Sequence, residues 1–289
     1  MSAVVEQAAG GAVAPTRRRR SRSATLGIGA VLVGIVVVVA VVSFVWLPYA
    51  PSDISGSRLS GPGPTHLLGT DKLGRDLLTQ LMIGARIALT VGIGSVAIGA
   101  LIGVTLGLLA AFASTWLDDT ISAALDIVIA FPTLLLAMLI VAAQGASLGS
   151  AILAIGLAMS AVVARLTRVL AKRVLSQQYV TAARTSGTGW LGIIGRHILP
   201  NIWPTLSVNL ALQFGVAVLA EASLSYLGLG APPPNASWGR LLQEAQGTVS
   251  TAPVGAIAPG VALVVLVIGV NLVADGLRDV ADPTRRRAR

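Results

Sequence analysis

Long apolar runs separated by short polar segments dominate the pattern along this chain. Five of these runs contain no charged residue, and they cover Ala24–Pro48, Ile87–Leu117, Ile127–Ala164, Ile198–Ala220 and Val254–Ala274. An α-helix needs about 20 apolar residues to cross roughly 30 Å of hydrocarbon, so the third run is too long for one helix. The polar stretch Gln144–Gly149 divides it into two spans. The pattern therefore predicts an all-α integral membrane protein with six transmembrane helices.

The same pattern divides the chain into five segments. We expect a disordered basic tail (1–23), a first span (24–48), a long loop (49–85), a core with spans two to six (86–277) and a second basic tail (278–289). The first run could instead be a cleaved signal peptide, because it follows a basic segment. Its apolar part is longer than a typical signal, and Trp46–Tyr49 is typical of an aromatic anchor at the membrane interface. An uncleaved span is the preferred interpretation.

Composition supports the membrane assignment and limits the chemistry. Hydrophobic residues make up 54% of the 289 positions and charged residues only 11%, whereas a typical soluble domain is about 25% charged. The net charge of +9 and the run Arg17–Arg20 could indicate nucleic-acid binding. In a protein with six spans, basic anchors on anionic headgroups explain both features, so no nucleic-acid partner is expected. The chain has no cysteine, which excludes disulfides and thiolate metal sites.

The positions of the basic residues predict the orientation of the spans. Lysine and arginine accumulate in loops that stay in the cytoplasm, and five arginines precede the first span. With six spans, both termini and the loop between spans four and five are then cytoplasmic. This topology leaves sixteen basic residues inside and only five outside, namely Arg58, Lys72, Arg75, Arg86 and Arg240.

The loop between spans four and five is basic and has helical character. Gln177–Ser186 is suited to a short helix, and Gly187 can take the left-handed conformation that ends it. Trp190–Ile198 is suited to a second short helix, whose apolar face combines Trp190 with isoleucines. Pro200 is expected to change the chain direction at the start of span five. Two interpretations are open on this evidence: a rigid knob that fits a cleft on a cytoplasmic protein, or a basic hairpin on the headgroups.

Small and acidic residues inside the spans are further candidates. Small residues line one face of span two at every fourth position: Ser95, Gly99, Gly103 and Gly107. This spacing predicts close packing against a neighbouring helix. Carboxylates near the membrane edge are functional candidates by default. For Asp126, at the cytoplasmic entry of span three, a structural hydrogen bond or an arginine pair is preferred, and Glu221 at the outer end of span five carries the same two interpretations.

The chain lacks the motifs of a catalytic protein. It contains no G-x-x-x-x-G-K-[ST] loop that could bind nucleotide phosphates. The two histidines, His66 and His197, lie on opposite sides of the predicted membrane, so no catalytic residue and no metal site are expected. A gradient-driven carrier usually holds several ionisable groups at mid-membrane, and these spans hold few. Uphill transport would therefore depend on a separate ATPase.

Four motifs, in order along the chain, resemble those of one transporter family. They are HLLGTDKLGRD at 66–76, YVTAARTSG with HILP within 179–200, EASLSYLGLG at 221–230 with Pro232–Pro234 and Ser237–Gly239, and NLVADGLRDVADP at 271–283. Over nearly its whole length the chain resembles the C-type permease subunit of binding-protein-dependent dipeptide and oligopeptide ABC importers, the peptide/nickel type.

The resemblance implies roles for the residues of these motifs. The cytoplasmic coupling loop, through which a separate ATPase drives the membrane subunit, would comprise Tyr179, Thr181, Ala182, Ala183, Arg184, Gly187, Trp190, Arg196, His197, Leu199 and Pro200. The extracytoplasmic motifs would comprise His66, Gly69, Thr70, Asp71, Gly74, Arg75, Asp76, Glu221, Gly228, Gly230 and Trp238. The chain departs from the pattern at Thr181, where the family has an acid, and at Leu67, where proline is common. Threonine can still cap a helix, so docking is expected to survive.

The resemblance also implies an assembly in the bacterial inner membrane. The fold would be that of a type I ABC importer permease with a cytoplasmic coupling-helix loop and a peripheral first span. Expected partners are a homologous B-type permease, two ATPase domains, an extracytoplasmic solute-binding protein and a peptide substrate. This chain would bind no cofactor, while the partner ATPases would use ATP and Mg. Nickel chelates, haem or another solute remain alternative cargoes, and a stand-alone channel or secondary carrier is the alternative class.

Overall fold

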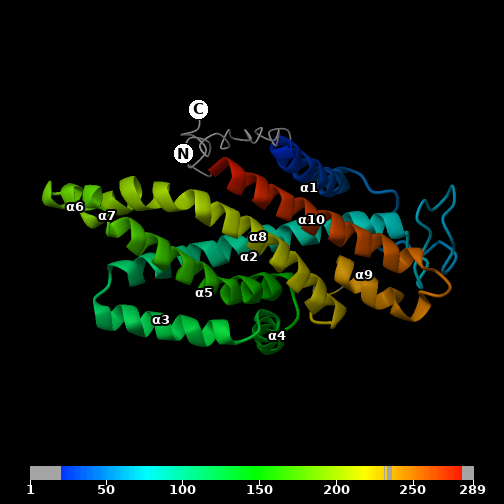
Figure 1. The fold of residues 1–289 in the computed structure, drawn as a ribbon. Coiled ribbons are helices and arrows are strands. Elements are labelled where there is room, and N and C mark those ends of the chain that lie inside the picture. The colour runs from blue at the N-terminus through cyan, green and yellow to red at the C-terminus, as the bar shows by residue number, and fades with distance from the viewer. Residues whose placement is uncertain (1–20, 231, 233–235, 282–289) are drawn as a thin grey trace, which may run out of the picture.

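The computed structural model describes residues 21–230, 232 and 236–281, which form a bundle of helices without strands (Figure 1). The helices are α1 (Ser21–Val45), α2 (Leu77–Phe112), α3 (Thr115–Ala130), α4 (Thr133–Gln144), α5 (Leu148–Leu175), α6 (Gln178–Thr185), α7 (Trp190–Ile193), the π-helical turn η1 (Ile194–Ile198), α8 (Leu199–Tyr226), α9 (Trp238–Ala245), the 3₁₀ turn η2 (Gln246–Thr248) and α10 (Val254–Ala281). The loop 46–76 and α9 lie at one end, and α6 and α7 lie at the other. Most of both predicted tails, residues 1–20 and 282–289, and the motif residues 233–234 fall outside the described residues.

In the described part of the chain, five helices are long and apolar enough to cross a membrane, and the count is six when the bent pair of α3 and α4 is taken as one span. This agrees with the six predicted spans. The third span is nevertheless not one helix, because α3 and α4 meet at 89°. Pro132 explains the break: proline has no backbone N–H and disfavours helical geometry in the residue before it. Phe131 is accordingly extended, with φ −79° and ψ 132°.

α2 begins at Leu77, well before Ile87, where the apolar pattern places the start of span two. Asp76 caps its N-terminus. The Asp76 carboxylate accepts hydrogen bonds from the Thr79 backbone N–H at 2.8 Å and from the Thr79 hydroxyl at 2.9 Å. The loop predicted over 49–85 therefore ends at the cap, and the first turns of α2 are buried inside the protein.

Arg86 is the charge that limits the predicted span, and α1 accommodates it. The Arg86 Nε donates a hydrogen bond to the Ser43 hydroxyl at 2.5 Å. Its guanidinium carbon lies 4.2 Å from the centroid of the Phe44 ring, within cation–π range. A helix can therefore include this arginine because a neighbouring helix supplies both a polar and an aromatic partner.

The small residues of α2 pack directly against α5. All four members of the predicted small face are buried: Ser95, Gly99, Gly103 and Gly107. A Cβ atom at Gly103 would lie 2.6 Å from the Ser160 carbonyl oxygen, and one at Gly107 would lie 2.5 Å from the Ala164 carbonyl oxygen. The predicted close helix packing is confirmed, and glycine is required because the two backbones approach within side-chain distance.

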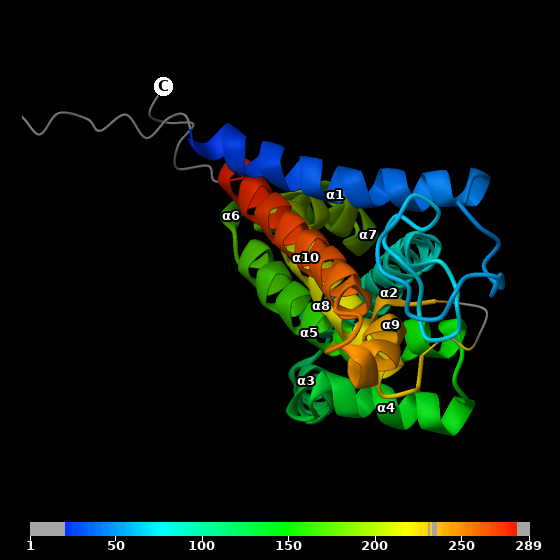
Figure 2. The same ribbon diagram turned by 90° about the vertical axis from the view of Figure 1, so that its right-hand side faces the viewer.

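α1 lies along α10 on the outside of the bundle (Figure 2). Glycines permit this contact as well, since a Cβ atom at Gly29 would lie 2.8 Å from the Gly269 carbonyl oxygen. The opposite face of α1 is open, with Val31 and Val38 exposed by 62% and 60%. Such apolar exposure suits a helix that faces hydrocarbon.

Candidate functional site

The two ends of the bundle carry the motif residues. At one end, residues 176–200, which we call the α6–α7 loop, contain the two short helices that the sequence predicts (Figure 1). Gly187 has a φ of +85° and follows the end of α6, as expected for glycine in the left-handed region. No atom lies within 4 Å of a Cβ atom built on Gly187, so the backbone conformation alone explains the glycine.

A buried apolar cluster fastens the α6–α7 loop to the bundle. Val180, Ile193 and Ile198 are buried together with Ala171 of α5 and Ile202 of α8. Burial of a valine or isoleucine side chain contributes about 1.5–3 kcal/mol, so the cluster holds the loop firmly against two long helices. A force applied to α6 and α7 would therefore reach α5 and α8.

The outer surface of the α6–α7 loop combines aromatic, aliphatic and basic side chains. Tyr179, Trp190 and Leu191 are 46%, 59% and 66% exposed. Arg184 and Arg196 are exposed as well. Tyrosine, tryptophan and arginine are enriched in protein interfaces because they combine contact area with hydrogen-bonding capacity. This surface is therefore a candidate docking site.

The remaining residues predicted for this site divide between surface and interior. Three of them are exposed, namely Thr181, Ala182 and Pro200. The other three are partly buried, namely Ala183, His197 and Leu199. The His197 and Tyr179 rings lie 5.8 Å apart, centroid to centroid. The prediction that Trp190 shares the apolar face of Ile193 is wrong, because Ile193 is buried and Trp190 is exposed. α7 is only four residues long and a π-helical turn follows it, so the 3.6-residue period does not extend from Trp190 through Ile198.

The chain does not change direction at Pro200, contrary to the sequence prediction. α7, η1 and α8 form one continuous helical stretch over Trp190–Tyr226. Pro200 lies at the start of α8, directly after the π turn. The π turn before it, in which the Leu199 N–H donates to the Ile194 carbonyl, accommodates the proline ring. The second half of the α6–α7 loop is thus an extension of α8.

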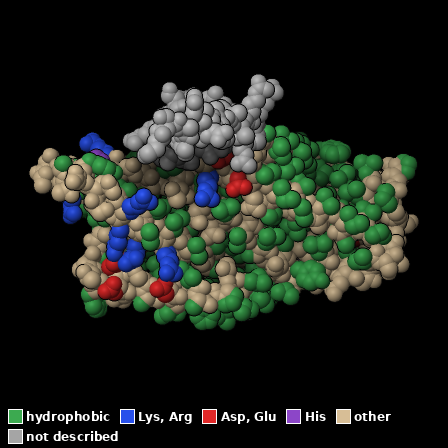
Figure 3. Space-filling model, viewed as in Figure 1, with side chains coloured by type: hydrophobic (Ala, Val, Ile, Leu, Met, Phe, Trp, Pro, Cys, Tyr) green, Lys and Arg blue, Asp and Glu red, His purple; other side chains and the backbone are tan. Residues whose placement is uncertain are grey.

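An ion-pair cluster joins α3 to α5 near this end of the bundle, where charged side chains gather in Figure 3. The Asp118 carboxylate accepts hydrogen bonds from Arg168 Nε at 2.5 Å, from Arg168 Nη2 at 2.7 Å and from the Lys172 ammonium. Arg165 lies 3.1 Å from Asp126, which confirms the predicted arginine pair. Asp118 was not singled out by the sequence pattern, because its partners lie on a different span.

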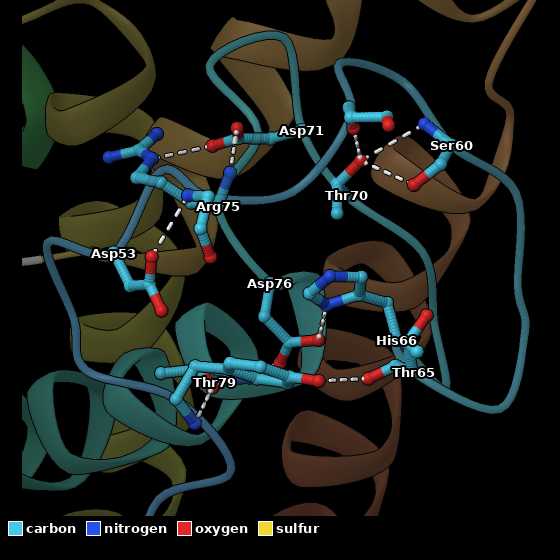
Figure 4. Close-up of polar contacts among 12 residues, drawn as sticks. Asp53, Ser60, Thr65, His66, Thr70, Asp71, Arg75, Asp76 and Thr79 are labelled. Carbon is cyan, nitrogen blue, oxygen red and sulfur yellow. Dashed lines mark hydrogen bonds and ion pairs between the residues drawn. The ribbon is translucent and has the colours of Figure 1, made fainter.

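At the opposite end, a network around His66 and Asp76 folds the loop 46–76 (Figure 4). His66 Nδ1 lies 3.0 Å from Asp76 Oδ1. The Tyr49 ring lies against the imidazole, with centroids 4.6 Å apart, and its hydroxyl donates to the Thr65 carbonyl oxygen. Because Asp76 also caps α2, the loop is tied to the first turn of that helix.

Arg75 links the same loop to α9. Its Nε donates to Asp71 Oδ2 at 2.6 Å, and its Nη2 donates to Glu244 Oε2 at 2.5 Å. The second Glu244 oxygen accepts a hydrogen bond from Arg240 Nε at 2.9 Å. Two arginines and two carboxylates thus alternate across the contact, so their charges balance.

Glycines permit the tight turns of the loop. Gly69 and Gly74 have φ values of +83° and +87°. A Cβ atom at either position would overlap a carbonyl oxygen, that of Ser60 or that of Gly56. Between them, the Thr70 hydroxyl accepts a hydrogen bond from the Ser60 backbone N–H at 3.0 Å. The motif at 66–76 therefore specifies one compact loop conformation.

The third motif joins α8 and α9 to α2. Glu221 is buried, and its carboxylate accepts a hydrogen bond from the Ser225 hydroxyl at 2.6 Å. The Trp238 indole N–H donates to the Leu81 carbonyl oxygen at 3.0 Å, and its ring packs on Gly84. Structural hydrogen bonding is therefore the interpretation that the contacts of Glu221 favour.

Two glycines shape the turn that follows α8. Gly228 has a φ of +82°, and a Cβ atom at Gly230 would overlap the Ser225 side chain. A cavity of about 310 Å³ opens beside this turn, and Arg240 and Gln243 contribute to its lining. The third motif thus also shapes a cavity at the α9 end.

The structure brings the predicted residues into two assemblies, the α6–α7 loop and the loop 46–76 with α9. Among the residues it describes, no group of three or more His, Cys, Asp or Glu side chains could hold a metal ion. Sequence reasoning missed the contributions of Tyr49, Asp118 and Glu244. The spacing of four between Arg240 and Glu244 was a usable signal, since such pairs meet on one face of a helix.

Comparisons with known proteins agree with this architecture. The family model described as "Binding-protein-dependent transport system inner membrane component" matches residues 103–287. Among solved structures, the MetNI methionine ABC transporter in inward-facing conformations has a chain of similar fold, with a TM-score of 0.60 and 21% identity, covering 70% of this chain and 96% of that one.

Curated relatives are similar over most of their length. The chain is 40% identical over 235 residues to the dipeptide transport system permease protein DppC of Alkalihalophilus pseudofirmus, covering 81% of this chain and 77% of that one. It is 38% identical over 260 residues to the glutathione transport system permease protein GsiD of Pectobacterium atrosepticum, covering 88% and 86%. It is 38% identical over 269 residues to the di/tripeptide transport system permease protein DppC of Pseudomonas aeruginosa, covering 90% and 89%. The chain therefore belongs to the family of inner membrane components of binding-protein-dependent transport systems, with the fold of an ABC importer permease.

Proposed function

We propose that this chain is the permease subunit of an ATP-driven importer and forms half of the membrane path for dipeptides and oligopeptides. The relatives named above as dipeptide, di/tripeptide and glutathione permeases support the choice of cargo, since all three substrates contain peptide bonds. Nickel chelates, haem and other solutes are the alternatives that a transport assay must exclude.

Energy enters this subunit through the α6–α7 loop. The observation that carries this proposal is that an exposed aromatic and basic surface stands on a loop rooted by buried residues in α5 and α8. Because α7 and η1 continue into α8, a push or pull on the loop acts along a membrane-spanning helix. Alternating access then follows from ATP-driven movement of two such loops, one on each permease.

The α6–α7 end faces the cytoplasm in this proposal, and the α9 end faces outward. The positive-inside rule supports this orientation, because Arg173, Arg184 and Arg196 lie at the α6–α7 end. Both chain termini are then cytoplasmic. A single cysteine in place of Thr185 should be shielded from an impermeant thiol reagent added outside intact cells. Labelling at this position would show that the α6–α7 end faces outward.

Partners complete the transporter. A homologous B-type permease supplies the other half of the path, and two ATPase domains dock below and bind the ATP and Mg. A solute-binding protein delivers cargo at the outer end, where ionic and turn contacts fix the loop 46–76 against α9. This subunit contributes positioning and movement rather than catalysis.

Crosslinking tests the docking site. In the assembled complex, cysteines in place of Ala183 or Thr185 should crosslink to the ATPase, whereas a matched cysteine at the exposed Leu101 of α2 should not. Restoring an acid with Thr181→Glu should be tolerated, because Thr181 is exposed. Crosslinks from Ala183 only to lipid or to the sister permease would overturn the docking assignment.

Reconstitution tests the transport class. Vesicles that contain both permeases, the ATPases and the binding protein should accumulate a dipeptide only when ATP is present on the side of the membrane where the ATPases are bound. The subunit alone should move no solute. Solute flux through the isolated subunit would instead identify a channel or a secondary carrier.

A further inference from the structure

A row of polar side chains follows α8 from its α6–α7 end to the middle of the membrane. The row recurs at every fourth position: Asn201, Thr205, Asn209 and Gln213. Residues four apart form one ridge on a helix surface, so we call these residues the polar ridge. With a rise of 1.5 Å per residue, Asn209 and Gln213 lie roughly 15 and 21 Å from the start of α8, well inside a hydrocarbon layer about 30 Å thick.

The two deep amides of the polar ridge are not satisfied by this chain. The Asn209 Oδ1 atom is buried without a hydrogen-bond partner. Exchanging the oxygen and nitrogen of the amide would leave an unpaired N–H in its place. Gln213 makes no side-chain hydrogen bond to any residue in the described ranges, and it is only partly buried. Unsatisfied amides at mid-membrane are costly. Asn209 and Gln213 are both partly exposed, so a polar neighbour outside this chain would reduce that cost.

Other faces of the bundle have a different character. The outer face of α2 exposes Ile93 and Leu101 by 62% and 73%. An apolar groove of about 520 Å³ between α1, α2, α8 and α10 is lined without a charged side chain. Both surfaces suit lipid chains. The polar ridge therefore marks a face of α8 that is not directed at lipid.

Another amide approaches α8 from α10. Asn271 Oδ1 would lie 4.0 Å from a Cβ atom on Gly215, and Asn271 is itself exposed. Gly215 lies two residues beyond Gln213, so Asn271 is close in depth to Gln213, and Asn209 lies roughly 9 Å nearer the α6–α7 end than Gly215. A row of carboxamides that continues along the helix axis offers successive hydrogen-bonding partners to a moving solute.

We propose that Asn209, Gln213 and Asn271 line the translocation path and hydrogen-bond the backbone amides of the passing peptide. This inference rests on the proposed function of the subunit. Each carboxamide offers both a donor and an acceptor without a charge. Such groups match the N–H and C=O groups that every peptide repeats, so they can bind a peptide irrespective of its side chains. Because they carry no charge, they do not retain any one peptide tightly.

Cysteine accessibility tests the location. The chain has no cysteine, so Asn209→Cys and the matched Ile93→Cys can each be assembled with the partner subunits and treated with a charged, water-soluble methanethiosulfonate. The reagent should modify position 209 at least tenfold faster than position 93, and saturating dipeptide should slow the reaction at 209. Equal rates, or a crosslink from position 209 to the sister permease in place of modification, would overturn the proposal.

A transport assay tests the chemistry. The double variant Asn209→Leu/Gln213→Met removes the amides at similar volume, and Thr105→Val is the control, since the Thr105 hydroxyl is satisfied by the Leu101 carbonyl at 2.7 Å. The double variant should assemble and keep basal ATP hydrolysis within twofold, while ATP-driven dipeptide uptake falls about tenfold. Wild-type uptake by the double variant would refute this inference alone. Failure of the wild-type complex to take up any peptide would instead refute the proposed function.

Discussion

Replacement of Gly103 by alanine tests the contact that joins α2 to α5. The new Cβ atom would lie 2.6 Å from the Ser160 carbonyl oxygen and 2.6 Å from Val163 Cβ. Neither atom is the movable end of a side chain, so one helix must shift. Gly260→Ala is the matched control, because Gly260 lies inside α10 with no atom within 4 Å of a built Cβ.

The magnitude follows from a comparison of these two variants. Both replace a helical glycine and gain about 1 kcal/mol of helix propensity. Only Gly103→Ala overpacks a contact, which costs about 1–3 kcal/mol. The free energy of unfolding of Gly103→Ala should therefore lie about 1–3 kcal/mol below that of Gly260→Ala, which is roughly a 5- to 140-fold difference in the folded-to-unfolded ratio.

Reversible unfolding by SDS in mixed micelles measures this difference, with helical circular dichroism as the signal. Gly107→Ala should behave like Gly103→Ala, because its Cβ atom would lie 2.5 Å from the Ala164 carbonyl oxygen. If Gly103→Ala proves as stable as Gly260→Ala, then the two helices do not approach as closely as described here, and the small face has another purpose.

Three further outcomes are expected. Asp118→Asn leaves two cations of α5 without their carboxylate and should lower the free energy of unfolding by about 1–3 kcal/mol in the same SDS titration. The loss is modest because these cations are partly solvated. An unchanged midpoint would contradict this expectation. Gly187→Ala should reduce peptide-stimulated ATP hydrolysis of the complex, whereas Gly189→Ala should not. Both sites have room for a Cβ atom, but only Gly187 has a positive φ. Equal activities of the two variants would show that the left-handed turn is dispensable. Arg75→Met should expose the loop 46–76 to limited proteolysis by removing the bridge to Glu244, and full protection would mean that the turn contacts suffice.

Several features of this protein follow from the sequence because they depend on local chemistry or on the membrane alone. The bilayer sets a minimum length for every apolar helix that crosses it, so the runs of uncharged residues predict the spans without knowledge of their neighbours. The end of α6 was predictable for a similar reason, since Gly187 adopts a backbone conformation that other residues avoid. The spacing of four residues between Gly103 and Gly107 likewise predicted a close helix contact, although it did not identify the partner helix.

Other features depend on which residues packing brings together. α2 begins at Leu77 because its first turns are buried against other helices, and it contains Arg86 because Ser43 and Phe44 of α1 receive the charge. A scan for uncharged runs treats any arginine as a boundary, since it has no information about partners. Asp118 was overlooked for the same reason, because Arg168 lies fifty positions away along the chain and becomes a neighbour only when α3 packs on α5.

The helical path around the two prolines also required the tertiary structure. Both Pro132 and Pro200 lack a backbone N–H, yet the chain bends by 89° at the first and continues as one helical stretch into α8 at the second. At Pro200 a π-helical turn and the buried side chains of Ile198 and Ile202 hold the helix together. The sequence by itself determined that this protein spans the membrane six times and carries a glycine-ended helix between spans four and five. Tertiary packing decided where those helices start, bend and join, because partners distant along the chain determine whether a charge or a missing hydrogen bond can be tolerated.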